Sequence, residues 1–140
     1  MATRQSQTGR VLEETALPAL RRAGYTIATQ VNVGTRPGGR PHKVDVCAER
    51  DGRRVLVSLK WQQVSGTAEQ KVPFEVMSLA EAVRCGHGDL AYLVLGGTAW
   101  TLRSFFMGQG LAGYFQPWVL GAVTVCDLET FITRANQVRL

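Results

Sequence analysis

The sequence predicts an α/β fold in which helices flank a mixed central β-sheet. Two observations carry this prediction: a β-hairpin built around an Asp-Gly turn, and helical segments that stand before, between and after the strands. The chain has 140 residues, 45% of them hydrophobic and 19% charged, which is ordinary for a globular protein. We therefore expect a single domain over residues 1–140, with residues 1–7 disordered.

Before the hairpin we expect one helix and one strand. Apolar residues recur at helical spacing over residues 8–22, and Gly24 is a natural stop after the last turn. Pro18 lies inside this helix and predicts a kink, because proline has no N–H for the helical hydrogen bond. Residues 25–33 alternate in polarity and predict a strand, whereas the Gly-, Pro- and Arg-rich residues 34–42 predict a flexible loop.

The hairpin itself covers residues 43–63. Its strands are residues 43–48 and 55–61, and Asp51-Gly52 between them is the dipeptide most typical of a two-residue hairpin turn. The second strand is mostly apolar, which predicts burial on both of its faces.

Two charged residues and a serine stand out in the strands of this hairpin. Asp45 and Lys60 lie mid-strand, and a charge in a buried sheet needs a partner because its desolvation is costly. Ser58 and Lys60 share one face, since side chains alternate along a strand, and pairing of the two strands can bring Asp45 near both. We therefore expect these three side chains to meet.

Five more segments complete the expected fold. They are a helix over residues 67–84, a strand over residues 89–95, a short helix and an aromatic-rich loop within residues 98–118, a strand over residues 119–126, and a helix over residues 128–137 with Asp127 as its N-cap. The order is thus α-β-β-β-α-β-(α)-β-α. The aromatic side chains of the 98–118 segment are expected in core and interface, with stacking on unpaired bases as the alternative.

The charge of the chain favours an anionic partner. The formal net charge is +5, and the isoelectric point is about 9.6. Nucleic acid is the commonest partner of such a protein. No apolar run reaches membrane-spanning length and no signal-peptide pattern is present, so we expect a cytoplasmic protein with no membrane partner. The sequence has no nucleotide-binding loop, GxSxG elbow or HExxH motif, so it gives no support to an NTPase, a serine hydrolase or a zinc protease.

The cysteines and histidines predict neither a disulfide nor a soft-metal site. Cys47, Cys85 and Cys126 are odd in number and lack a CxxC spacing, so we expect them to be reduced and to pack in the core. His42 and His87 stand far from any other soft ligand in the sequence, and we expect both in loops.

The arrangement of Asp45, the hairpin turn and the Ser-Leu-Lys end of the second strand resembles the core of the PD-(D/E)XK nuclease superfamily. In that family an Asp and a second acid two residues before a Lys hold a divalent metal beside the scissile phosphate. The resemblance implies a restriction-endonuclease-like fold with Asp45 as a metal ligand and Lys60 as the contact to phosphate and water. It also implies Mg²⁺ or Mn²⁺ as the cofactor and DNA as the partner.

Ser58 stands where the family has its second acid, and three explanations are open. An acid elsewhere can complete the site, as in some restriction endonucleases whose Ser-x-Lys pattern is followed by a Glu on the next helix. Glu75, 15 residues after Lys60, resembles that arrangement, and Glu69 is a second option. Alternatively, the site is naturally inactive and the protein only binds DNA. The third explanation is that Ser58 is an engineered replacement of a native acid.

The first helix adds a further candidate metal ligand. Archaeal-type Holliday junction resolvases place a Glu there, upstream of a Gly that ends the helix. Glu13 and Gly24 resemble that arrangement, with Glu14 as a rival for the same role. The expected DNA-binding residues are Arg10, which lies one turn from Glu13, and Lys43, Gln62, Gln63 and Lys71.

The resemblance thus implies a Mg²⁺-dependent DNA endonuclease, with Glu13 favouring four-way junctions or other branched DNA as the substrate. Glu75 favours the alternative of a sequence-specific enzyme of restriction or homing type. A catalytically inactive DNA-binding domain of the same fold is the third reading. We expect a homodimer that places two sites on two strands, as in junction resolvases and small restriction enzymes, because the small size leaves no room for a separate recognition domain.

Overall fold

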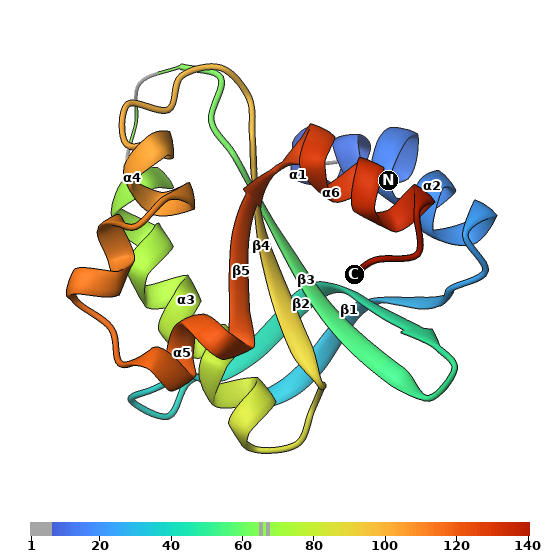
Figure 1. Ribbon diagram of the computed structural model, residues 1–140, viewed down its shortest axis with the longest axis horizontal. Coiled ribbons are helices and arrows are strands. Elements are labelled where there is room, and N and C mark those ends of the chain that lie inside the picture. Colours follow the sequence, from blue (N-terminus) through green and yellow to red (C-terminus); the bar gives the residue numbers. More distant parts are fainter. Residues whose placement is uncertain (1–6, 65, 67) are drawn as a thin grey trace, which may run out of the picture.

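A computed structural model describes residues 7–64, 66 and 68–140 and shows one mixed five-stranded sheet with helices on both faces (Figure 1). The strands follow one another across the sheet in sequence order. The first three pair antiparallel, and the last three run parallel. The fold class expected from the sequence is confirmed. The strands are β1 Thr26–Thr35, β2 Pro41–Arg50, β3 Arg53–Trp61, β4 Leu90–Gly96 and β5 Val123–Asp127.

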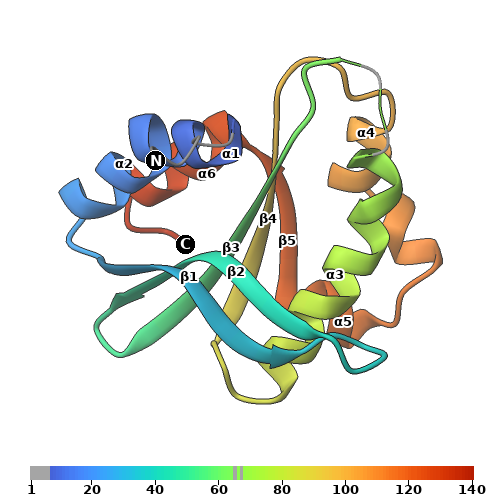
Figure 2. The same cartoon turned by 180° about the vertical axis from the view of Figure 1, so that it is seen from behind.

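Helices cover the two faces as separate groups, and each group closes its own apolar core. On one face α1, α2 and α6 pack around Leu20 and Phe131, and on the other α3, α4 and α5 pack around Leu56 and Leu79 (Figures 1 and 2). The helical segments are α1 Gln7–Val11, the π-helical turn η1 Leu12–Ala16, α2 Leu17–Arg22, α3 Ala68–Arg84, α4 Arg103–Met107, the 3₁₀ turn η2 Gly110–Gly113, α5 Pro117–Ala122 and α6 Leu128–Asn136. Of the N-terminal segment expected to be disordered, Gln7 already begins α1, and residues 1–6 lie outside the described part of the chain.

The kink expected at Pro18 is replaced by a π-helical turn just before it. The backbone N–H of Leu17 bonds to the carbonyl of Leu12, five residues back, in place of the usual four. Pro18 then stands in the first turn of α2, where its missing N–H costs no hydrogen bond. The helix therefore continues past the proline and ends at Arg22.

The central hairpin forms as predicted. Asp51 and Gly52 both have positive φ, at 53° and 78°, which defines the type I′ turn that matches the twist of two paired strands. Val55 to Leu59 in β3 are all buried, as their apolar run indicated. β3 lies in the middle of the sheet, paired with β2 on one side and β4 on the other.

Two segments differ from the expectation. The loop expected over residues 34–42 is a tight turn, because β1 runs to Thr35 and β2 already begins at Pro41. His42 is therefore a buried strand residue and not a loop residue. The strand expected over residues 119–126 begins only at Val123, because Pro117 opens helix α5, in whose first turn a proline is favoured.

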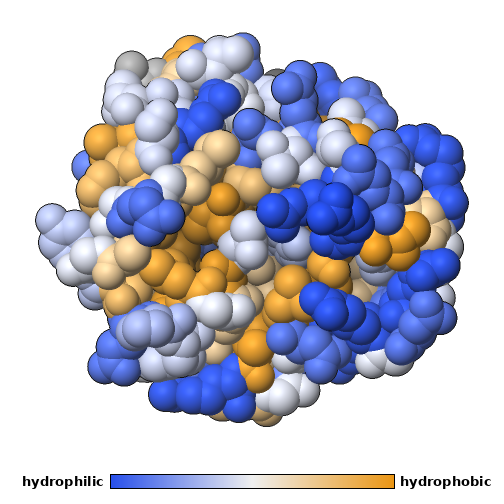
Figure 3. Space-filling model, viewed as in Figure 1, coloured by the Kyte–Doolittle hydropathy of each residue, from blue (hydrophilic) through white to orange (hydrophobic). Residues whose placement is uncertain are grey.

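The 98–118 segment contributes to both core and surface. Trp100, Phe106 and Leu111 are buried, whereas Phe105, Tyr114 and Trp118 are exposed. Apolar side chains gather over the α3 to α5 side in Figure 3. The expectation that aromatic side chains of this segment enter the core thus holds for Trp100 and Phe106, and the exposed ones leave the interface and base-stacking alternatives as predictions.

All three cysteines are free, as expected, but only two of them lie in the core. Cys47 and Cys126 are buried in strands, and Cys85 is exposed at the end of α3. Among the described residues, no helix has the length and apolar character needed to cross a membrane.

Candidate active site

The site lies where β2 and β3 part. Their pairing ends at Val46 and Val57, although both strands continue beyond this point. At the fork, the carboxylate of Asp45 accepts the backbone N–H of Leu59 at 2.8 Å. Asp45 thus takes over a backbone donor at the place where the ladder opens, which fixes its carboxylate at the base of the gap.

The neighbouring strand is distorted at the same level. In β1, Thr29 pairs with Val46 and Val31 with Val44, so Gln30 stands opposite Asp45. Gln30 has a φ of 52°, a left-handed conformation that is uncommon for a residue other than glycine. Its side-chain amide lies 3.5 Å from Oδ1 of Asp45.

Asp45 is a carboxyl group whose charge is poorly solvated. Burial raises its pKa above the ordinary value, and the negative charge of Glu75 acts in the same direction. The N–H of Leu59 and the charge of Lys60 oppose this rise without cancelling it. A cation bound beside Asp45 would therefore relieve an unfavourable charge.

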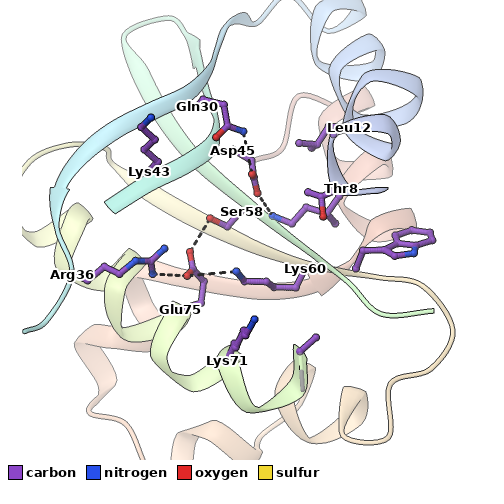
Figure 4. Close-up of a pocket in the computed structure, with 14 residues that line it drawn as sticks. Thr8, Leu12, Gln30, Arg36, Lys43, Asp45, Ser58, Lys60, Lys71 and Glu75 are labelled. Carbon is purple, nitrogen blue, oxygen red and sulfur yellow. Dashed lines mark hydrogen bonds and ion pairs between the residues drawn. The ribbon is translucent and has the colours of Figure 1, made fainter. Parts of the chain in front are cut away.

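Glu75 reaches the site from α3 on the opposite side of the gap and is only 4% exposed (Figure 4). Its Oε1 accepts a hydrogen bond from Ser58 Oγ at 3.0 Å and lies 3.3 Å from Nε2 of His42. Its Oε2 lies 2.7 Å from Nη1 of Arg36 and 3.9 Å from Nζ of Lys60. Each oxygen of this buried carboxylate is thus held by two partners.

These partners keep Glu75 ionised. Burial on its own would raise the pKa of Glu75, but the hydrogen bond with His42 and the charges of Lys60 and Arg36 lower it to about 2. Asp45 and Glu75 therefore differ: the pKa of one carboxyl is raised and that of the other is lowered.

Apart from the fully buried His42, the side chains that interact with Asp45 and Glu75 line a solvent-connected cavity of about 430 Å³. Six residues predicted from the sequence to act in catalysis, metal binding or DNA binding are among its lining residues: Lys43, Asp45, Ser58, Lys60, Lys71 and Glu75. Lys43 and Lys71 are exposed and carry no ion pair to the described residues (Figure 4). Thr8 and Gly9 of α1 also line the cavity.

Glu13 and Arg10 lie elsewhere. Both are exposed on the first helix, and neither lines the cavity, although Leu12 next to them does. The π-helical turn contains Glu13, and the exposed side chain of this residue extends away from the core face held by Leu12 and Ala16.

Gln62, Gln63 and Glu69 also fall outside the cavity. Gln62 is buried, and its side-chain amide donates a hydrogen bond to the carbonyl of Ala99. Gln63 is exposed just beyond β3. Glu69 accepts the backbone N–H groups of Thr101 and Leu102, and of the two acids considered as substitutes only Glu75 lines the cavity.

Three residues of the site were not predicted from the sequence: Gln30, Arg36 and His42. His42 is fully buried and alternates with Val44 along β2, which is the one pattern that could have placed it in a strand. Arg36 belongs to a segment rich in Arg, Gly and Pro, but nothing in the sequence couples it to an acid 39 residues away. Gln30 is revealed only by its backbone conformation.

The carboxylates in the cavity suit a hard divalent cation. Mg²⁺ is usually held by one or two carboxylates, with water and substrate phosphate completing its coordination. Asp45 and Glu75 supply two carboxylates, and a cation beside Asp45 would offset the burial that raises the pKa of its carboxyl group. Within the described residues, no three His, Cys, Asp or Glu side chains gather as a fuller metal cage, so the cation would depend on solvent and substrate oxygens.

Comparison with known proteins identifies the family. A family model described as a PD-(D/E)XK nuclease superfamily domain matches residues 4–139. The chain belongs to this superfamily. The resemblance inferred from Asp45, the hairpin and Lys60 is therefore confirmed at the level of family and fold. A search of curated proteins finds no match to this chain.

Solved structures share the superfamily fold at low sequence identity. An FdxN element excision controlling factor protein from Anabaena variabilis is 21% identical with a TM-score of 0.53, and the match covers 87% of this chain and 94% of that one. An XisH family protein from Nostoc punctiforme PCC 73102 is 20% identical with a TM-score of 0.53, covering 86% and 94%. A protein of unknown function, AF1548, is 16% identical with a TM-score of 0.52; the match covers 80% of this chain but only about half, 54%, of that protein.

Proposed function

We propose that this member of the PD-(D/E)XK nuclease superfamily is a divalent-metal-dependent DNA endonuclease. The hydrogen bond between Ser58 Oγ and Glu75 Oε1 carries the proposal. It sets a helix carboxylate beside the strand position at which the family motif has its second acid. Together with Asp45 and Lys60, this carboxylate gives one cavity the charges that phosphodiester hydrolysis requires.

In this proposal, each side chain of the candidate site has its own role in catalysis. Asp45 and Glu75 would hold Mg²⁺ or Mn²⁺, which when bound neutralises charge on the phosphate and lowers the pKa of a water. The ammonium group of Lys60 is partly exposed in the cavity, so it can contact a phosphate oxygen and orient the attacking water. Ser58 and His42 fix the orientation of the Glu75 carboxylate from the side away from solvent.

DNA would approach the cavity over Lys43 and Lys71. Both ammonium groups are exposed, and each can contact a backbone phosphate without giving up a partner. The net charge of +5 strengthens this attraction over the whole molecule. We also propose a homodimer that presents two such cavities to the two strands of a duplex.

Two substrate classes belong to this proposal. Branched DNA such as a four-way junction follows from the resemblance of the first helix to that of junction resolvases, and α1 borders the cavity. A sequence-specific enzyme of restriction or homing type is the second candidate. The bond between Ser58 and Glu75 favours it, because that enzyme group pairs Ser-x-Lys with a helix Glu.

The test is cleavage by the purified protein with Mg²⁺ or Mn²⁺, on a labelled four-way junction and on plasmid. The variants are Asp45→Ala, Glu75→Ala and Lys60→Ala. Glu69→Ala is the matched control, because Glu69 lies on the same helix as Glu75 but outside the cavity. We expect cleavage to vanish in the first three variants and to persist in the control.

The pattern of cleavage separates the alternatives. Cutting of the junction alone indicates a structure-selective enzyme, and discrete plasmid bands indicate a sequence-specific one. Cleavage seen only with Ser58→Glu would mean that the protein with Ser58 is a nuclease inactivated by the loss of one acid. Binding of DNA without cleavage by any of these proteins would sink the enzyme proposal and leave a DNA-binding domain.

A further inference from the structure

The turn between β1 and β2 places the guanidinium of Arg36 against Glu75, one of the two acids proposed to hold the metal. Arg36 is the first residue after β1, and Nη1 of its guanidinium lies 2.7 Å from Oε2 of Glu75. The turn reaches the α3 side of the molecule here (Figure 2), and the guanidinium also faces the Phe74 ring at 6.0 Å. Because the Arg36 side chain is 23% exposed, the ion pair stands at the edge of the cavity and not deep inside it.

Arg36 contacts Oε2 of Glu75, the oxygen that Ser58 and His42 do not hold. Oε1 is already engaged by Ser58 and His42, on the inner side of the carboxylate. Among the residues that the structure describes, the partners of Oε2 are two cations, with Arg36 in direct contact and Lys60 at 3.9 Å. A divalent cation on Oε2 would stand against the guanidinium, and the repulsion between like charges at such separation is large in a partly buried site.

Arg36 stands at the start of a short turn whose tip is open to solvent. The turn is closed by hydrogen bonds between Arg36 and Arg40 and between Gly39 and Arg36. Gly38 and Gly39 at its tip have positive φ, and no atom lies within 4 Å of the position that a Cβ would take at either residue. Because Arg36 and Lys43 both line the cavity, we expect an Arg36 side chain released from Glu75 to stay within reach of a phosphate bound there.

We propose that Arg36 is an exchangeable counter-ion: it pairs with Glu75 in the metal-free protein, leaves it when a divalent cation binds, and then contacts a DNA phosphate. This inference rests on the proposed nuclease function and adds regulation to it. Because the same guanidinium opposes the metal and attracts DNA, metal binding and DNA binding strengthen each other. By thermodynamic linkage, the factor is the same in both directions.

The test measures binding, not cleavage, with Mn²⁺ as the metal in calorimetry. Wild type, Arg36→Gln and Arg36→Lys are compared, and the affinity for a labelled four-way junction is measured with Ca²⁺ and with EDTA. Arg36→Gln is expected to bind Mn²⁺ about fivefold more tightly or better, and to lose the gain in DNA affinity that Ca²⁺ gives to wild type. Arg36→Lys keeps a cation and should lie between the two.

Lys43→Ala is the matched control for the DNA arm, since Lys43 lines the same cavity without contacting Glu75. Lys43→Ala should lower the affinity for DNA by the same factor in Ca²⁺ as in EDTA. Equal or weaker Mn²⁺ binding by Arg36→Gln would overturn the exchange, while leaving the nuclease proposal intact. If wild type binds no Mn²⁺, or binds it as well after Asp45→Asn, the proposed function itself fails.

Discussion

Glu75 illustrates how a single residue can be decisive and still be hard to read in a sequence. Its carboxylate is nearly inaccessible to solvent, yet four polar partners from three other segments keep it charged. Asp45 and Lys60 could be predicted because they lie in one hairpin, where spacing fixes proximity. His42 and Arg36 could not, because their only link to the site is a contact with a helix that follows 33 and 39 residues later.

The charge of Glu75 makes stability depend on acidity. Its pKa falls from 4.5 to about 2 in the folded chain, so its contribution is complete above about pH 5 and is lost as the pH falls towards 2. The contribution is on the order of 3 kcal/mol. We expect urea unfolding to show Glu75→Gln as less stable than wild type at pH 7, with a difference that shrinks below about pH 5.

The comparison with Glu75→Gln is needed because Asp45 acts in the opposite sense. Its raised pKa means that the folded chain takes up a proton more readily than the unfolded chain, so acidification favours folding through Asp45. The difference between the two proteins removes the part of this contribution that comes from burial of Asp45 and keeps the smaller part that comes from the charge of Glu75. An unchanged difference at pH 7 and pH 3 would contradict the assignment of Glu75 as the ionised member of the pair.

Regular elements were predictable where local rules and burial agree. The hairpin, α3 and the helix capped by Asp127 all appear within a few residues of their expected bounds. The predicted elements differ from the structure where one sequence pattern is compatible with two kinds of element. Residues 34–42 look like a loop because of their glycines and prolines, and the apolar Val119 and Leu120 suit a strand until Pro117 is counted as a helix start.

The N-cap of α6 gives a prediction at this scale. The Asp127 side chain accepts the backbone N–H of Thr130 at 2.7 Å, satisfying one of the free donors at the helix start. Asp127→Ala should lower the free energy of unfolding by about 1 kcal/mol, and Asp127→Asn should retain most of it. Urea unfolding of the three proteins tests this, and equal losses for both variants would refute the cap.

Alanine variants of two glycines distinguish the cost of a left-handed backbone from the cost of a steric overlap. Gly97, just after β4, has a φ of 90°, and a Cβ there would lie 2.3 Å from the carbonyl oxygen of Gln62. Gly39 has a φ of 97° with no atom near its Cβ position. Both Ala variants carry a left-handed penalty of about 1–2 kcal/mol.

Gly97→Ala should be less stable than Gly39→Ala by a further amount of about 1–3 kcal/mol, because the end of β3 must shift. Thermal unfolding of the two variants gives this difference directly. Equal melting temperatures would mean that Gln62 moves aside at no cost.

At the scale of the whole molecule, the order of the strands follows from the order of the elements. Three consecutive antiparallel strands need only turns, whereas the parallel pairs β3–β4 and β4–β5 need the crossovers that α3 and the 98–122 segment supply. The sequence therefore predicts the sheet well. It does not predict that the pairing of β2 and β3 ends at Val46 and Val57, because both strands continue in extended form beyond this point.

The basic character of the chain predicts how DNA binding responds to salt. Each phosphate neutralised by Lys43 or Lys71 should contribute about 0.9 to the slope of log K against log salt concentration. Fluorescence anisotropy over a salt series should give the double variant Lys43→Ala/Lys71→Ala a slope shallower by about 2. Arg139→Ala, which lies beside α6 and outside the cavity, is the control and should keep the wild-type slope.

Because the second carboxylate comes from α3 and not from the strand beside Asp45, the two halves of the site are joined through the apolar contacts of that helix. Val72, Val76 and Leu79 set the height and rotation at which α3 lies on the sheet, and so the distance between the two acids. A genetic screen for loss of cleavage should therefore return buried aliphatic positions alongside the charged ones. Among these variants, folded proteins with normal DNA affinity would identify residues whose role is to hold the two acids that we propose as metal ligands at the right separation.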